Sequence, residues 1–74
     1  MMYFERIKQL VINYGLTHDE ISKEYIKLNG DKGVSRAMIT GMLNGSEEMT
    51  VTNYLRLMNA IKQAHITKAK KLNS

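Results

Sequence analysis

Residues 33–45 read GVSRAMITGMLNG, and this stretch decides the fold. Ser35 is a natural N-cap, because its hydroxyl can accept a hydrogen bond from a free amide in the first turn of a helix. A short helix is predicted over 36–43, and Asn44-Gly45 closes it as a C-terminal cap. An Asn-Gly pair also favours a hairpin, but the residues before it do not alternate in polarity as strands do, so we expect a helix. Its inward-facing residues would be Ile39, Met42 and Leu43.

A second helix is expected before this stretch. Thr17 and Glu20 have the spacing of a capping box, in which the threonine hydroxyl accepts from one amide and the glutamate carboxylate accepts from the other. The box predicts a helix over 17–28, which Asn29-Gly30 ends. Its apolar stripe would consist of Ile21, Tyr25 and Leu28.

Two more helices flank this pair. A helix over 4–14 is predicted by apolar residues at helical spacing, and a glycine ends it. The same period predicts a helix over 50–63, with Thr50 as its N-cap. Residues 65–74 would form a basic C-terminal tail or a short fifth helix. The apolar stripes are Ile7, Leu10, Val11 and Tyr14 in the first of these helices, and Val51, Tyr54, Leu55, Met58 and Ile61 in the second.

Length and composition predict one small domain with a single core. The chain has 74 residues, 43% of them apolar, with no proline and five glycines. We therefore expect an all-α fold, a compact bundle of four to five helices, with the domain over 1–64 and the tail over 65–74. No apolar run approaches the roughly 18 residues that a membrane span needs, and the N-terminus lacks a secretory signal pattern. These observations predict a cytoplasmic protein with no membrane partner.

The sequence carries no pattern typical of catalysis or metal binding. Without cysteine there is neither a disulfide nor a thiolate zinc site. The glycines between Gly30 and Ser35 have the wrong spacing for a phosphate-binding loop, and no H-E-x-x-H pair is present. His18 and His65 have no acid or nucleophile at a telling interval. We expect no enzymatic activity, no cofactor and no metal.

Positive charge is concentrated in the second half of the chain. Five basic and five acidic residues cancel over residues 1–34, whereas six basic and two acidic residues give +4 over residues 35–74. A basic surface is a weak indication of a polyanionic partner, because phosphate contacts supply the sequence-independent part of nucleic-acid affinity. A solvated surface explains the same excess almost as well.

The order of the predicted helices is that of a helix-turn-helix, in which the second, short helix lies in the DNA major groove. The residues that carry a family resemblance are 15–22, GLTHDEIS, and 33–40, GVSRAMIT, together with the Asn44-Gly45 ending. Over about residues 5–62 the chain resembles the Cro/phage-repressor (XRE-like) family. The resemblance implies a lambda-repressor-like bundle and a small, repressor-like transcriptional regulator of the phage or plasmid type that binds double-stranded DNA sequence-specifically.

The resemblance also implies which residues would face DNA. Arg36 could contact guanine O6 and N7 in a bidentate manner, or could simply lie in the first turn of a surface helix. Thr17 and Asn44 are equally explained as helix caps, and His18 as an exposed surface residue. The base-facing set would be Arg36, Ala37, Thr40 and Gly41, and the phosphate-facing set Thr17, His18, Ser35 and Asn44.

A module of this size makes few contacts with DNA, so we expect a homodimer on a pseudo-palindromic operator with half-sites about 34 Å apart. Two surfaces could form the dimer interface. One is the tail, with Ile66, Ala69 and Leu72, and the other is the N-terminal segment, with Met2, Tyr3 and Phe4.

Three features depart from the family pattern. Residues 26–32 are an insertion before Val34 that would either extend helix 17–28 or form a loop. Gly41 stands where such families place a contacting side chain, which indicates either a close backbone approach or a weaker helix. Glu47 and Glu48 are acidic where phosphate would lie. These features favour an alternative function, a protein-interaction module with a helix-turn-helix fold that binds another regulator or a host protein instead of DNA.

Overall fold

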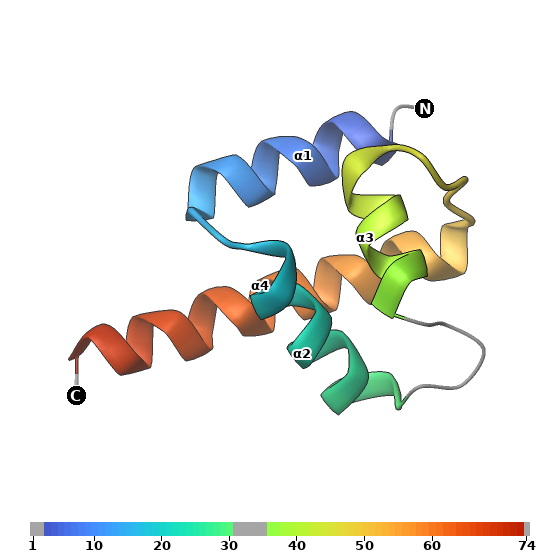
Figure 1. Ribbon diagram of the computed structural model, residues 1–74. Coiled ribbons are helices and arrows are strands. Elements are labelled where there is room, and N and C mark those ends of the chain that lie inside the picture. Colours follow the sequence, from blue (N-terminus) through green and yellow to red (C-terminus); the bar gives the residue numbers. More distant parts are fainter. Residues whose placement is uncertain (1–2, 31–35, 74) are drawn as a thin grey trace.

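The computed structural model describes residues 3–30 and 36–73, and these residues form four α-helices and no strand (Figure 1). The helices are α1 (Tyr3–Tyr14), α2 (His18–Asn29), α3 (Arg36–Asn44) and α4 (Val51–Asn73). The all-helical prediction is confirmed. The predicted fifth helix is wrong as a separate element, because residues 65–73 continue α4 without a break. Among the described residues, no helix combines the length and the apolar character that crossing a membrane requires.

The predicted caps form as local hydrogen bonds. The Thr17 hydroxyl accepts from the Glu20 amide at 3.1 Å, and the Glu20 carboxylate accepts from the Thr17 amide at 2.8 Å, which completes the capping box of α2. Thr50 Oγ1 accepts from the Asn53 amide at 3.1 Å at the start of α4. Gly30 follows α2 with a φ of 71°, a left-handed value that favours glycine. The predicted N-cap of α3, Ser35, lies outside the described residues.

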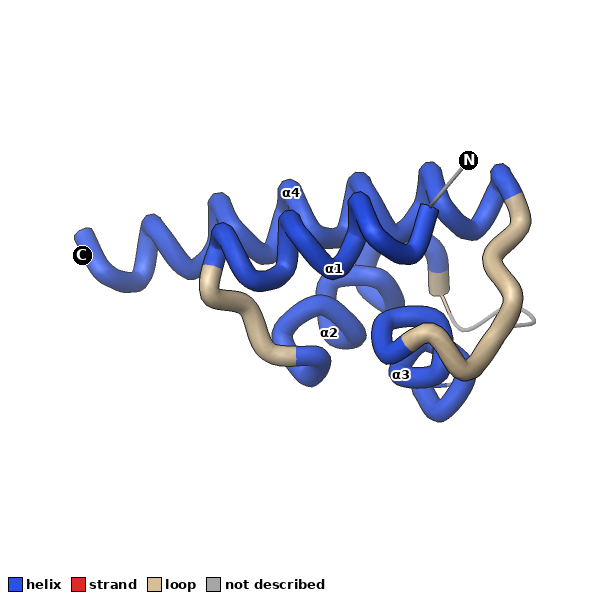
Figure 2. The backbone as a smooth tube through the Cα atoms, turned by 90° about the horizontal axis from the view of Figure 1, so that it is seen from above, coloured by secondary structure: helices blue, strands red, loops and turns tan. Residues whose placement is uncertain are grey.

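The core draws on all four helices and on Leu16 between α1 and α2. Among the helix pairs, α2 and α4 pack most extensively, and α3 contacts α1 and α2. Figure 2 shows the C-terminal end of α4 extending beyond the end of α1. The buried apolar residues are Ile7, Leu16, Ile21, Tyr25, Ile39, Met42, Leu43, Leu57, Ala60, Ile61 and Ala64.

Three residues assigned to apolar stripes are exposed instead. Val51 and Leu55 are 57% and 56% exposed, because the inner face of α4 is centred on the buried residues between Leu57 and Ala64. Leu28 is 50% exposed because the last turn of α2 runs past the core and borders an open hollow beside α4. The first part of the insertion, through Asn29, extends α2, which was one of the two structures expected for it. The rest of the insertion lies mostly outside the described residues.

Contacts with α1, α2 and the turn between them explain why α4 continues past residue 64. An isolated helix end of this length would be marginal in water, so tertiary contacts have to hold it. These contacts pair Lys68 Nζ with the Gly15 carbonyl (2.7 Å) and with Glu20 (3.5 Å), Thr67 Oγ1 with Glu24 Oε1 (3.2 Å), and the His65 ring with the Tyr14 ring (4.1 Å between centroids).

Candidate nucleic-acid interface

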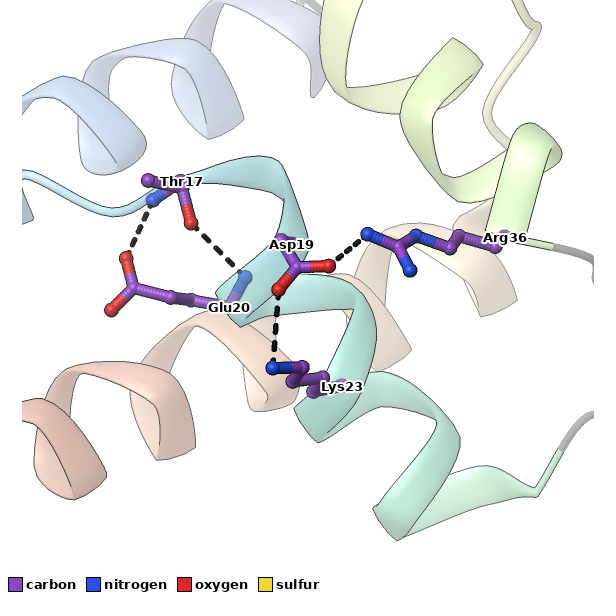
Figure 3. A network of polar contacts seen from close by, with 5 residues as sticks. All are labelled: Thr17, Asp19, Glu20, Lys23 and Arg36. Atoms are coloured by element: carbon purple, nitrogen blue, oxygen red, sulfur yellow. Dashed lines mark hydrogen bonds and ion pairs between the residues drawn. The ribbon is translucent and has the colours of Figure 1, made fainter.

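An ion pair joins the start of α3 to the first turn of α2 (Figure 3). The Arg36 guanidinium donates through Nη2 to Asp19 Oδ1, and Lys23 Nζ lies 3.2 Å from the other oxygen, Asp19 Oδ2. The Arg36 side chain is nevertheless 64% exposed. The pair therefore holds the N-terminal ends of α2 and α3 side by side and leaves the arginine open to solvent.

The four residues expected to face bases do not share one exposed surface. Arg36 and Ala37 are exposed and Thr40 is half-buried, whereas Gly41 is buried. The expected exposure of Gly41 is thus wrong. A Cβ atom added to Gly41 would overlap Glu47 Cγ and would lie 3.2 Å from Ser46 Oγ. Of the two explanations for this glycine, a close approach of another segment is the one observed.

Hydrogen bonds at the end of α3 explain this close approach. The Gly41 carbonyl accepts from the Ser46 amide at 2.8 Å and from the Glu47 amide at 3.1 Å, which draws the chain after α3 back over the helix. Gly45 permits this return, since its φ of 86° is in the left-handed region. The face of α3 that remains open is therefore its N-terminal half.

The described residues that were expected to face phosphate lie at the start of α2 and at the end of α3. Thr17 is exposed but its hydroxyl is engaged as the cap of α2. His18 is half-buried, not fully exposed as expected, and lines a hollow together with Asn44. Asn44 is exposed, and its Oδ1 accepts from the Ser46 amide at 3.1 Å, so its side chain helps to end α3. Ser35, the fourth residue of the set, lies outside the described residues.

The N-terminus of α2 is occupied by the protein's own carboxylates. Asp19 and Glu20 both lie in its first turn, where the helix dipole favours negative charge. The hydrogen bond from the Thr17 amide is the main cause that holds the pKa of Glu20 below its ordinary value of 4.5, partial burial opposes it, and the Thr17 hydroxyl and Lys68 add to it. A phosphate at this helix end would compete with the carboxyl groups of Asp19 and Glu20.

The two lysines in the last turn of α4 do not add positive charge near α3. Lys70 and Lys71 lie in the last turn of α4, and that end of α4 is at the opposite end of the molecule from α3 (Figures 1 and 2). Glu47 and Glu48 are exposed in the segment that follows α3. Among the described residues, Arg36 of α3 and Lys23 of α2 are the cations that contact Asp19 at this site.

The Asp19–Arg36 pair was missed by sequence reasoning. Both residues stand at predicted helix starts with opposite charges, which is a usable signal, but 17 residues separate them and only the packing of α2 on α3 brings them together.

Comparison with known proteins gives no relative for this chain: no family model, no curated protein and no solved structure matches it. Within the described residues, no group of three or more histidine, aspartate or glutamate side chains is arranged to hold a metal ion.

Proposed function

We propose that the protein binds double-stranded DNA sequence-specifically, as a small repressor-like transcriptional regulator of the phage or plasmid type, with a lambda-repressor-like helix-turn-helix formed by α2 and α3. The observation that carries the proposal is the exposure of Arg36 and Ala37 on the first turn of α3, beside the N-terminus of α2. An exposed arginine at a helix start retains N–H groups for guanine O6 and N7, and alanine suits the methyl group of thymine.

The dimensions of α3 are compatible with this role. A helix with its side chains is about 10–12 Å in diameter, so it fits the major groove, which is about 12 Å wide. The nine residues of α3 make it roughly 13 Å long. Since the segment after α3 covers Gly41, only the half from Arg36 to Thr40 would read bases. Each copy would then contact few base pairs, so specific binding requires two copies on a pseudo-palindromic operator.

The dimer would form through the C-terminal end of α4. Ile66 and Leu72 are 45% and 78% exposed there. The alternative N-terminal surface is less suitable, because the Phe4 ring packs against Gly45. We expect Ile66→Glu with Leu72→Glu to shift the protein to monomer in sedimentation equilibrium and to weaken operator binding. Unchanged self-association of this double variant would exclude the α4 interface.

The direct test is selection of bound duplexes from a random pool, followed by affinity measurements on the enriched and on a scrambled duplex. We expect one enriched motif and an affinity that falls linearly on a log–log plot as salt rises from about 50 to 200 mM, because each neutralised phosphate releases counterions. Absence of enrichment together with absence of salt-dependent binding would contradict the proposal.

Glu47 and Glu48 favour a second candidate function. In it, the protein is an interaction module that binds a protein partner with a basic surface instead of DNA. Both are exposed next to α3, where they would repel phosphate. Replacing both with glutamine separates the two candidates. If the protein binds DNA, affinity for any duplex rises in this variant. If it is an interaction module, neither form binds DNA and the variant loses affinity for a basic protein partner.

A further inference from the structure

Asp19 is held from two sides. Its Oδ1 accepts from the Arg36 guanidinium, and its Oδ2 lies 3.2 Å from Lys23 Nζ, one turn further along α2 (Figure 3). The Asp19 side chain is 42% exposed, so its carboxylate lies at the protein surface beside the Arg36 side chain. Two cations thus contact one carboxylate, and Asp19 accepts the Arg36 side chain at a defined position.

Among the described residues, Asp19 occupies only part of the hydrogen-bonding capacity of the Arg36 guanidinium. The guanidinium carries five N–H donors in a planar fork, and Asp19 engages Nη2. The remaining donors can still form hydrogen bonds with a base edge. Because the ion pair has already restricted the side chain, less rotational freedom is lost when such a contact forms.

The charge of Asp19 changes what Arg36 attracts. A free arginine at this position would bind the phosphates of any duplex, which contributes affinity without sequence information. The adjacent carboxylate compensates the charge of Arg36 and repels phosphate oxygens, while neutral acceptors such as guanine O6 and N7 are repelled much less.

We propose that Asp19 is a positioning residue that determines specificity: it holds Arg36 for a base contact and keeps it from acting as a phosphate contact. This inference rests on the proposed DNA binding. It assigns to α2 a role in sequence readout through α3, without a base contact of its own.

The test compares Asp19→Asn with Glu5→Gln in the full chain. Glu5 is an exposed acid in the first turn of α1, so its replacement removes the same charge from an equivalent helix position away from Arg36. Each protein is titrated with the enriched and the scrambled duplex over a salt series, and far-UV circular dichroism checks that each is folded. Asp19→Glu is included because it retains the carboxylate.

For Asp19→Asn we expect tighter binding to the scrambled duplex and a log–log salt slope steeper by up to about 0.9, the value for one more neutralised phosphate. The preference for the enriched duplex should fall roughly fivefold, the lower end of what a bidentate base contact contributes. Asp19→Glu should retain part of the preference. Glu5→Gln should change neither slope nor preference.

An Asp19→Asn protein with the slope and preference of Glu5→Gln would overturn the inference and leave DNA binding intact. A wild-type protein without any sequence preference would instead refute the proposed function itself.

Discussion

Glu47 lies directly over the backbone of Gly41, and the amide of Glu47 donates a hydrogen bond to the Gly41 carbonyl at 3.1 Å. A segment that follows α3 is thereby packed against the middle of the same helix. This contact requires a residue without a side chain on α3, and it restricts the open face of the helix to the half from Arg36 to Thr40.

We expect Gly41→Ala to destabilise the protein, although alanine is the better helix former. Helix propensity favours the change by about 1 kcal/mol, but an added methyl group in a filled site costs about 1–3 kcal/mol, so the net loss should be about 1 kcal/mol. Urea unfolding measures it. Glu47→Ala removes Cγ but keeps Cβ, which would lie 3.3 Å from the methyl group added at position 41. The double variant should therefore recover most of the lost stability. A Gly41→Ala protein more stable than wild type would contradict the contact.

The capping box predicts a specific pH dependence. Since the pKa of Glu20 in the folded protein is lowered below its ordinary value of 4.5, its ionised form stabilises the fold above that pH, and this contribution is lost as the pH falls through the lowered pKa. We expect Glu20→Gln to be less stable than wild type near neutral pH, with the difference shrinking in acid below about pH 4.5. Thermal unfolding across pH measures this. Glu5→Gln, which replaces an exposed acid in the first turn of α1, is the matched control.

The tie between α4 and the α1–α2 turn is testable through Lys68. We expect Lys68→Met to cost about 1 kcal/mol, a value lowered by the partial exposure of the Lys68 and Glu20 side chains, and to accelerate amide exchange in the last turns of α4. Lys70→Met is the matched control, since Lys70 is exposed on the same helix. Equal exchange rates in both variants would show that the Lys68 contacts do not hold this end.

Features that depend on neighbouring residues were predictable from the sequence. The capping box at Thr17 and Glu20 and the cap at Thr50 involve residues only three positions apart, so their spacing alone indicates the hydrogen bonds. The inward face of α3 was also correct, because Ile39, Met42 and Leu43 are buried.

Features that depend on distant contacts were not predictable. The continuation of α4 rests on the contacts that Lys68 and Thr67 make with residues more than 40 positions away. On α4 the prediction was correct for Ile61, Tyr54 and Met58 but wrong for Val51 and Leu55, which are exposed. The small residues Ala60 and Ala64 are buried instead, in the helix that packs most extensively against α2. The contact of Glu47 with Gly41 likewise depends on the turn after α3, and the spacing of apolar residues in the sequence does not predict the geometry of that turn.

The proposed base contact of Arg36 on α3 is tested most directly by the ratio of affinities for the selected and the scrambled duplex, measured at one salt concentration for wild type and Arg36→Ala. We expect the ratio to fall by about 5-fold to 150-fold in Arg36→Ala, while weak, salt-sensitive binding to both duplexes persists. An equal loss of affinity for both duplexes, with the ratio unchanged, would contradict the claim and make Arg36 a phosphate contact.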